Sequence, residues 1–312
     1  MNFQQLEYIV ALAERQHFGK AAQDCYVTQA TLSAMIKKLE EELNVQLFDR
    51  SSHPVLPTEV GQLIIQQAKV ILHGQEELVA LAAQDNHILN GELKVGVIPT
   101  VANSLLPIIL KHIIKAHPEL RLDIMEVTTE EIKSRLKNGS IDIGILVTPI
   151  HDPALEEEVL YYESLMVYGV EDENKKFMLS EDINSSKVWL LEEGHCFKNQ
   201  AMTLCKIQED RSRTEHLEFS GSSFETLLNL SDTFGGFTLI PELFYQTLPA
   251  HRKKRTRGFG SPIPVREVSI VSHRPAIRRN IIGKLKDLIQ ERVSPRLLTQ
   301  ELEESEMDII SI

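Results

Sequence analysis

Few cysteines, few aromatic residues and no long apolar run characterise this sequence. Three of its 312 residues are cysteines, and aromatic residues make up 6%. No apolar stretch approaches the ~20 residues of a membrane span, and residues 1–7 lack the basic start and apolar core of a signal peptide. We therefore expect a cytoplasmic protein. In that compartment standing disulfides are uncommon, so a cysteine pair is more often catalytic, metal-binding or redox-sensing.

Positive charge is also scarce. The chain has 33 Lys and Arg residues against 45 Asp and Glu residues, which gives a net charge of −12. This balance argues against a general nucleic-acid binder but leaves room for a small DNA-reading module in a mostly acidic chain. Hydrophobic residues at 42% and charged residues at 25% are typical of a globular protein long enough for two or three compact units.

The first 58 residues predict three helices. Apolar residues recur at helical spacing over 2–15, a short helix follows around 19–23, and a third begins after Thr28, which can cap it. One face of the third helix is apolar, and its other side carries Gln29, Thr31, Ser33, Lys37 and Lys38. Amide and hydroxyl groups followed by lysines suit a DNA major groove. A helical bundle with a solvated polar face is the alternative.

Residues 58–89 carry a long apolar stripe that predicts one helix. About thirty helical residues span about 45 Å, which is more apolar surface than one small neighbour covers. Pairing with a second copy of the chain is one solution, and its two-fold symmetry would match a dyad DNA site. A core helix of the same chain is the alternative. Residues 85–91 form the expected hinge.

From about residue 90 to 300, predicted strands and helices alternate, which indicates a parallel sheet with helices on both faces. A second unit begins near 164–170, the chain returns to the first unit near 265–271, and 281–289 forms a closing helix. The acidic segment 301–308 is expected to be disordered. The basic cluster 252–257 is expected to be a solvated loop.

The most informative stretch is 193–205, which holds two of the three cysteines. His195 precedes Cys196 and Lys198 follows it, and neighbouring basic groups favour the reactive thiolate. Cys205 lies nine residues on and is placed to resolve an oxidised Cys196. Two inert core cysteines, or a zinc site that lacks an obvious fourth ligand, are the alternatives. Cys25 has no basic neighbour and is expected to be structural.

Residues 198–205 contain no Gly or Pro, and Phe197, Ala201 and Leu204 are spaced for one helical face. If this run is helical, nine residues separate the Cα atoms of Cys196 and Cys205 by about 13 Å. A disulfide requires them within about 7 Å. The bond therefore requires the segment to unwind, and we expect this unwinding to be the conformational signal.

Several motifs in the N-terminal segment resemble the winged helix-turn-helix of LysR-type transcriptional regulators. They are Phe18–Ala22, Val27–Ser33, Ile36–Leu43, Leu47–Arg50 and Thr58–Gly61. The family usually has proline where Ala30 stands, and a more basic wing than Arg50 provides here. The resemblance implies that Gln29, Thr31, Ser33, Lys37, Lys38 and Arg50 bind DNA.

Within that family the chain resembles the hydrogen-peroxide-sensing OxyR subfamily. The motifs are Gly194–Cys196, Gln200–Met202, Val97–Thr100, Glu126–Thr129 and His273–Pro275, together with the cysteine offset. The implied fold is a multidomain α/β protein with a two-lobed regulatory domain related to periplasmic binding proteins. The implied boundaries are 1–58 for the winged helix-turn-helix, 59–89 for the linker and dimerisation helix, 90–161 with 267–300 for the first lobe, 162–266 for the second, and 301–312 for the acidic tail.

The resemblance also assigns the redox chemistry. Cys196 would attack the peroxide and Cys205 would resolve the sulfenic acid. Thr100 and Thr129 would hold the peroxide oxygens, His195 would orient the site or relay a proton, and Arg274 would stabilise the thiolate and the departing hydroxide.

The implied function is a redox-sensing transcription factor that activates oxidative-stress genes, with no enzymatic activity, no cofactor and no metal. Its implied partners are dyad-related promoter DNA, hydrogen peroxide, further copies of itself as a dimer or tetramer, RNA polymerase, and a thiol reductant such as a glutaredoxin or thioredoxin. Three alternatives stay open: a regulator that binds a small carboxylate, a thiol peroxidase, and a constitutive architectural DNA-binding protein.

Overall fold

The computed structural model describes residues 1–50, 54–82, 91–172, 174–183, 188–191, 196–204, 223–273 and 279–310. The chain divides into two compact units, one N-terminal and one that comprises most of the chain after residue 86. Each is described by itself. None of the helices in these ranges is long and apolar enough to cross a membrane.

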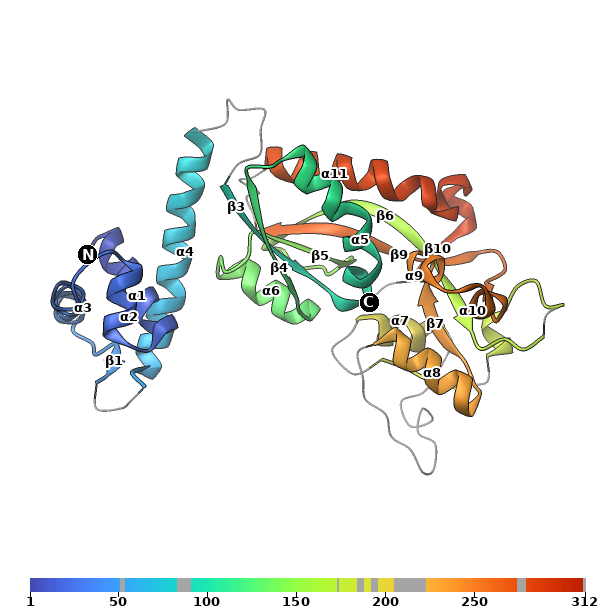
Figure 1. The fold of residues 1–312 in the computed structure, drawn as a ribbon, viewed down its shortest axis with the longest axis horizontal. Coiled ribbons are helices and arrows are strands. Elements are labelled where there is room, and N and C mark those ends of the chain that lie inside the picture. Colours follow the sequence, from blue (N-terminus) through green and yellow to red (C-terminus); the bar gives the residue numbers. More distant parts are fainter. Residues whose placement is uncertain are drawn as a thin grey trace. The chain divides into compact units, whose positions relative to one another are not determined.

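The N-terminal unit begins with the three predicted helices, which are α1 (Phe3–Arg15), α2 (Phe18–Asp24) and α3 (Gln29–Leu43) (Figure 1). Asn2 and Gln5 form a capping box at the start of α1, and the Thr28 hydroxyl accepts from the Thr31 amide at the start of α3. These caps satisfy amides that the helices themselves leave unpaired. The apolar faces of all three helices meet in one core.

Two short antiparallel strands, β1 (Phe48–Asp49) and β2 (Leu56–Pro57), form the wing. The long helix predicted next is α4 (Glu59–Ala82), and the Thr58 hydroxyl accepts from the Gly61 amide in its first turn. A Cβ at Gly61 would lie 2.0 Å from the carbonyl oxygen of Leu47. Glycine is therefore required where α4 passes the end of the wing.

The larger unit begins with three parallel strands and the helices that connect them. These are β3 (Gly91–Val97), α5 (Pro99–Ala116), β4 (Leu120–Glu126), α6 (Thr129–Lys137) and β5 (Ile143–Thr148). A Cβ at Gly96 or Gly144 would meet Ile132 of α6, whereas Val95 points toward α5 and α11 (Arg279–Val293). Since neighbouring strand residues point to opposite faces, helices cover both faces of this sheet, as predicted.

The sheet is mixed, in contrast to the expected parallel arrangement. Its order is β4-β3-β5-β9-β6-β7, and β9 (Ile263–His273) runs antiparallel to both β5 and β6 (Leu155–Tyr168). Beyond Ser164, β6 leaves β9 and pairs with β7 (Thr238–Pro241) and β8 (Thr256–Gly258). The long strands β6 and β9 thus belong to both lobes. The strand β9 returns between β5 and β6, and the direction of a returning strand depends on its connection and its place in the sheet, which strand patterns alone do not report.

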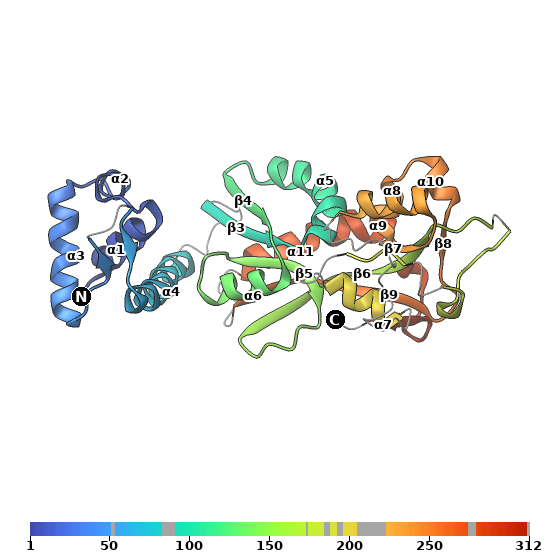
Figure 2. The same ribbon diagram turned by 90° about the horizontal axis from the view of Figure 1, so that it is seen from below.

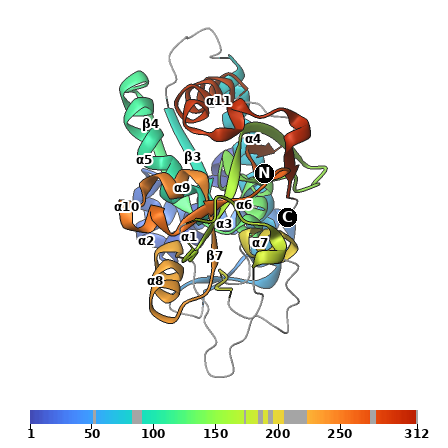
Figure 3. The ribbon, with the colours of Figure 1, turned by 90° about the vertical axis from the view of Figure 1, so that its right-hand side faces the viewer.

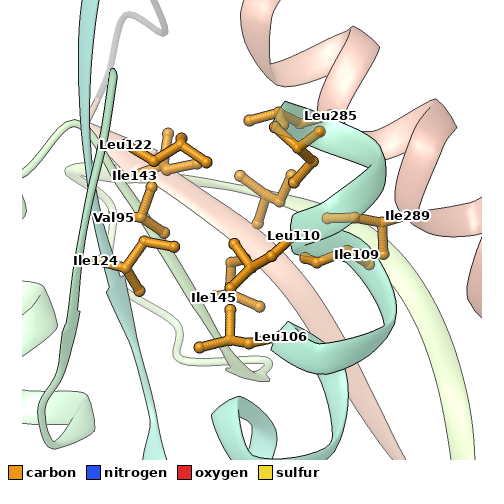
Figure 4. Close-up of a pocket in the computed structure, with 12 residues that line it drawn as sticks. Val95, Leu106, Ile109, Leu110, Leu122, Ile124, Ile143, Ile145, Leu285 and Ile289 are labelled. Carbon is orange, nitrogen blue, oxygen red and sulfur yellow. The ribbon is translucent and has the colours of Figure 1, made fainter. Parts of the chain in front are cut away.

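The second lobe contains four short helices, α7 (Cys196–Leu204), α8 (Phe224–Phe234), α9 (Glu242–Thr247) and α10 (Ala250–Lys254). Each lobe has its own hydrophobic cluster, and Phe197 and Ala201 of α7 belong to the second. The first cluster encloses an apolar cavity of about 20 Å³ between α5, α11 and the sheet, with Val95, Ile109 and Leu285 in its lining (Figure 4). Because the lining is aliphatic, this space is a small packing void.

The prediction of a disordered acidic tail is wrong. After α11, three 3₁₀ turns (Ser294–Arg296, Leu298–Glu301 and Glu304–Glu306) lead to β10 (Met307–Ile309), which pairs in parallel with Ile263–Val265 of β9. Ile310 is buried in the second hydrophobic cluster. Composition suggested disorder because acidic residues dominate the segment. In the structure Glu303, Glu306 and Asp308 are exposed, while Met307–Ile309 pairs with β9 and Ile310 is buried.

The basic cluster 252–257 is also not a solvated loop. It forms the end of α10 and the start of β8, and its three arginines are partly buried. Arg252 pairs with Glu225 and Asp232, and Arg255 pairs with Asp232. Both carboxylates lie on α8, outside the basic cluster, so the charge of the cluster alone did not reveal these ion pairs.

Candidate functional site

The candidate DNA-reading element is α3. Leu32, Ile36 and Leu39 are fully buried against the rest of the N-terminal unit. The opposite side of the helix carries the predicted contacts Gln29, Thr31, Ser33, Lys37 and Lys38, of which all but the half-buried Ser33 are exposed. Packing therefore fixes the helix through one face and presents the polar face to solvent.

Arg50, the predicted wing contact, is exposed but already pairs with other residues of this unit. Its Nη2 lies 2.7 Å from Glu40 Oε2, and its guanidinium sits 5.6 Å from the centroid of the Phe18 ring. Glu40 also accepts from the backbone amide of Leu47. Arg50 thus joins the end of α3 to the wing, and a part of its charge is already neutralised.

The structure brings Thr100 and Thr129 to the same edge of the sheet. Val97 of β3 pairs with Glu126 of β4 in register, and each threonine follows three residues later in the first turn of a helix. Both side chains are buried. The hydroxyl of Thr129 has no hydrogen-bond partner within the described part of the chain, so it is available to a ligand.

A buried ion pair lies beside Thr100, and no motif in the sequence indicated either of its members. Arg266 of β9 and Glu163 of β6 both have fully buried side chains, and Arg266 Nη2 lies 2.6 Å from Glu163 Oε1. Arg266 also donates to the hydroxyl of Thr100 at 3.2 Å and to its carbonyl at 3.0 Å. The guanidinium therefore joins strands of both lobes to the start of α5.

The same guanidinium contacts α7, the helix that begins at Cys196. It lies 5.4 Å from the centroid of the Phe197 ring, within the range of a cation–π interaction. Phe197 also makes an edge-on contact with Phe224, at 5.1 Å between ring centroids. Cys196 is the first residue of α7, where unpaired amides and the helix dipole favour a thiolate.

The remaining predicted redox residues, His195, Cys205 and Arg274, lie outside the described residues, as does the side chain of Cys196. Arg266 is the functional candidate that the sequence analysis missed. The available signal was a pair of charged residues, Arg266 and Glu267, within the mostly apolar run 263–271. A metal site has no support in the described ranges, where no three His, Cys, Asp or Glu side chains gather.

Cys25 has the environment of an inert thiol. Partial burial raises its pKa, and the negative charges of Glu7 and Asp24 raise it further. A raised pKa reduces the thiolate fraction at neutral pH. The structure therefore agrees with the expectation that Cys25 is structural.

Comparison with known proteins places both units in one family. Residues 3–62 match the bacterial regulatory helix-turn-helix of the lysR family, and residues 86–294 match the LysR substrate binding domain. The chain belongs to the LysR family of transcriptional regulators. This membership confirms the predicted fold class, a helix-turn-helix followed by a two-lobed α/β domain, and it makes the protein a non-enzymatic, DNA-binding regulator.

Several relatives of this LysR-family chain are OxyR proteins. The hydrogen peroxide-inducible genes activator of Dickeya chrysanthemi is 34% identical over 299 residues, covering 94% of this chain and 96% of that protein. OxyR of Escherichia coli K12, a DNA-binding transcriptional dual regulator, has the same identity and coverage. EstR of Acinetobacter baylyi, a helix-turn-helix regulator, is 33% identical over 250 residues, or 79% of this chain and 81% of that protein.

Solved structures give the same result. A full-length OxyR variant from Pseudomonas aeruginosa superposes with a TM-score of 0.77 at 32% identity, covering 93% of this chain and 98% of that one. A peroxide-bound OxyR variant from Corynebacterium glutamicum has a TM-score of 0.62 at 28% identity, covering 95% and 94% of the two chains. The predicted resemblance to the OxyR subfamily is confirmed.

Proposed function

We propose that this protein is a peroxide-responsive transcription factor that switches through a disulfide between Cys196 and Cys205. One observation carries the proposal. Cys196 begins a helix whose next residue, Phe197, contacts the buried Arg266, and Arg266 also holds Thr100. The names of the OxyR relatives support the same stimulus. As a regulator of bacterial promoters, it would act in the cytoplasm.

The helix α3 would recognise DNA. We infer that its exposed amide and hydroxyl groups, Gln29, Thr31 and Ser33, read base edges in the major groove. Lys37 and Lys38 are exposed further along the helix and would contact phosphates. Arg50 could also contact a phosphate, but its positive charge would then be shared between that phosphate and the carboxylate of Glu40.

The helix α4 would pair two chains. One face of α4 packs on the core of the N-terminal unit through Ile65 and Ala68. Five further apolar side chains of α4 are exposed, and they are Val60, Leu63, Val70, Ile71 and Leu78. An apolar stripe of this kind is typical of an interaction surface. Pairing of α4 with its copy would set two α3 helices against a dyad promoter site, as a dimer or within a tetramer.

The redox step converts one peroxide and two thiols into a disulfide and two waters. The Cys196 thiolate attacks one peroxide oxygen, the S–O bond forms as the O–O bond breaks, and the departing hydroxide takes a proton. The Cys205 thiolate then attacks the sulfur of the sulfenic acid, and the S–S bond forms as hydroxide leaves and is protonated. His195 would relay these protons.

The buried groups supply the environment for this step. Thr100 and Thr129 would hold the two peroxide oxygens, and the buried hydroxyl of Thr129 has no hydrogen-bond partner in the described structure. Arg266 adds positive charge beside α7, in addition to the role proposed for Arg274. Since Arg266 is paired with Glu163, its main effect is to position Thr100 and Phe197.

The switch follows from the helical form of α7. The described helix Cys196–Leu204 is regular, so Cys205 would lie about 13 Å from Cys196 if the helix continued by one residue. Disulfide formation would unwind α7 and pull Phe197 and Ala201 from the second hydrophobic cluster. The rearranged lobe would change the spacing of the α3 helices on DNA and the contact with RNA polymerase. A glutaredoxin or thioredoxin would restore the thiols.

DNA footprinting tests the proposal. The wild type, Cys196→Ser and the matched control Cys25→Ser are each footprinted on the protein's own promoter, reduced and after peroxide. We expect oxidation to change the footprint of the wild type and of Cys25→Ser, and to leave Cys196→Ser unchanged. An identical footprint for reduced and oxidised wild type would refute the redox function.

The alternative function is a regulator that responds to a small carboxylate in place of peroxide. The chain is similar at nearly the same identity to EstR, a regulator whose name states no response to peroxide, so this alternative is tested as well. In that case Cys196→Ser would respond to its metabolite like the wild type, and peroxide would leave both footprints unchanged.

A further inference from the structure

The C-terminal segment 297–310 lies beyond residue 294, where the match to the family's regulatory domain ends, yet it contacts both lobes. Leu297 is buried in the cluster of the first lobe, and Ile310 is buried in the cluster of the second. Between them, the amide of Leu298 donates to Glu242 at 2.8 Å and the hydroxyl of Thr299 donates to the carbonyl of Tyr162 at 2.6 Å. We call this segment the strap.

The end of the strap is attached to α7. The fully buried side chain of Gln200, in the middle of α7, donates from Nε2 to the carbonyl of Ile310 at 2.7 Å. The amide of Ile310 donates to the carbonyl of Val265 in β9 at 2.9 Å. Ile310 thus bridges α7 and β9, and the end of the described chain lies beside α7 in Figures 2 and 3.

This attachment matters because α7 has only nine residues. Helices of that length are marginal by themselves in water, so packing must supply most of the stability of α7. Phe197 and Ala201 supply the apolar part of that packing. Gln200 supplies the polar part through the bond from its Nε2 to Ile310. Its Oε1 is buried without a partner in the described structure, so losing the bond to Ile310 would leave the buried amide nitrogen unpaired as well.

We propose that the strap holds α7 in its helical form and that unwinding of α7 releases Met307–Ile310 from β9. The trigger, formation of the Cys196–Cys205 disulfide, rests on the proposed function. The holding role does not, because it is a property of the reduced protein. Gln200 is a positioning residue in this scheme. The strap determines the peroxide concentration at which the Cys196–Cys205 disulfide forms.

The direction of the effect follows from linkage. The strap binds the helical form of α7 and loses its contacts when α7 unwinds, so it stabilises the reduced state relative to the oxidised state. Because α7 must unwind before the bond forms, removing the strap should speed disulfide formation by at least about tenfold, the factor expected for the loss of one buried hydrogen bond alone. A tenfold change in the thiol–disulfide equilibrium corresponds to about 30 mV in reduction potential.

Two neighbouring isoleucines give a matched pair of variants. Ile310 is 6% exposed, whereas Ile309 is 47% exposed. Ile310→Ser should undock the strap, and Ile309→Ser should leave it in place. Gln200→Met, which removes the amide at similar volume, is the second test variant. Because Trp189 is the only tryptophan and lies in the second lobe, its fluorescence shows whether each variant is folded.

Hydrogen–deuterium exchange of the full-length reduced proteins tests the holding role. Ile310→Ser and Gln200→Met should raise exchange in peptides covering 197–204 by about tenfold, while Ile309→Ser should match the wild type. Equal protection of α7 in all four proteins would overturn the holding role.

Exchange after peroxide treatment tests the release, with the Cys196–Cys205 disulfide quantified in the same samples by mass spectrometry. Oxidised wild type should lose protection at 307–310, and Ile310→Ser should form the disulfide about tenfold faster. A disulfide that forms while 307–310 stays protected would overturn the release and leave the proposed function standing. If the wild type forms no disulfide, the proposed function fails, and the reduced-state comparison alone decides the holding role.

Discussion

The buried pair Arg266–Glu163 offers the sharpest test of how the two lobes are joined. Both side chains are fully buried, they come from β9 and β6, and Arg266 also holds Thr100. Removing one partner of a buried pair leaves an uncompensated charge and costs about 3–5 kcal/mol. Arg266→Met and Glu163→Gln should each destabilise the larger unit by at least about 3 kcal/mol.

The double variant should cost much less than the sum of the two. Once Arg266 is Met, changing Glu163 to Gln removes the stranded charge, so we expect a coupling energy of about 2 kcal/mol. An exposed pair supplies the matched control. Arg121 Nε and Glu92 Oε1 lie 3.8 Å apart on the neighbouring strands β4 and β3, and Arg121→Met should cost less than about 0.5 kcal/mol.

Urea unfolding followed by the fluorescence of Trp189 measures these costs. The indole N–H of Trp189 donates to the carbonyl of Gly235 at 2.9 Å, so its emission changes when the second lobe unfolds. In a thermal scan, 3 kcal/mol corresponds to about 6–12 °C for a domain of this size. Costs that add to within 0.5 kcal/mol in the double variant, a coupling too small for a pair in contact, would refute the reasoning.

Four further predictions concern single sites. Thr28→Ala removes the cap of α3 and should lower the free energy of unfolding of the N-terminal unit by about 1 kcal/mol in thermal denaturation, with Thr28→Ser nearly neutral. Burial raises the pKa of Glu242 despite hydrogen bonds that lower it, so the stability contributed by its protonated form is present below about pH 4.3 and is lost as pH rises through the folded pKa. As pH rises from 4 to 7, the urea midpoint of Glu242→Gln should therefore rise relative to that of the wild type. A difference between the two midpoints that stays constant with pH would contradict this. Cys25, whose pKa is raised by burial, should react with iodoacetamide at neutral pH more slowly than glutathione does, as followed by peptide mass spectrometry. Val95→Ile adds a methyl group to the apolar cavity and should stabilise by about 0.5 kcal/mol in the same urea assay, whereas Val97→Ile, in a filled part of the core, should destabilise.

The helix-turn-helix could be predicted from the sequence because its determinants are local. A capping residue such as Thr28 and the apolar spacing of Leu32, Ile36 and Leu39 act within one helix. Gly61 depends on a contact within the same unit, since it only has to let the chain pass Leu47 on the other side of the short wing. The helical form of α7 followed in the same way from a run without Gly or Pro.

The tertiary structure decided what depends on partners distant in the sequence. Arg266 meets Glu163 across 103 residues and Thr100 across 166, and only the sheet order brings them together. The tail was misjudged because its composition is acidic, yet Ile310 finds a carbonyl in β9 and the amide of Gln200, 110 residues away. By itself the sequence determined the elements, the family and the cysteine spacing, because these are properties of short segments. Only the packed chain decided which buried charges pair and what holds α7, because burial and long-range hydrogen bonds exist only once the lobes have formed.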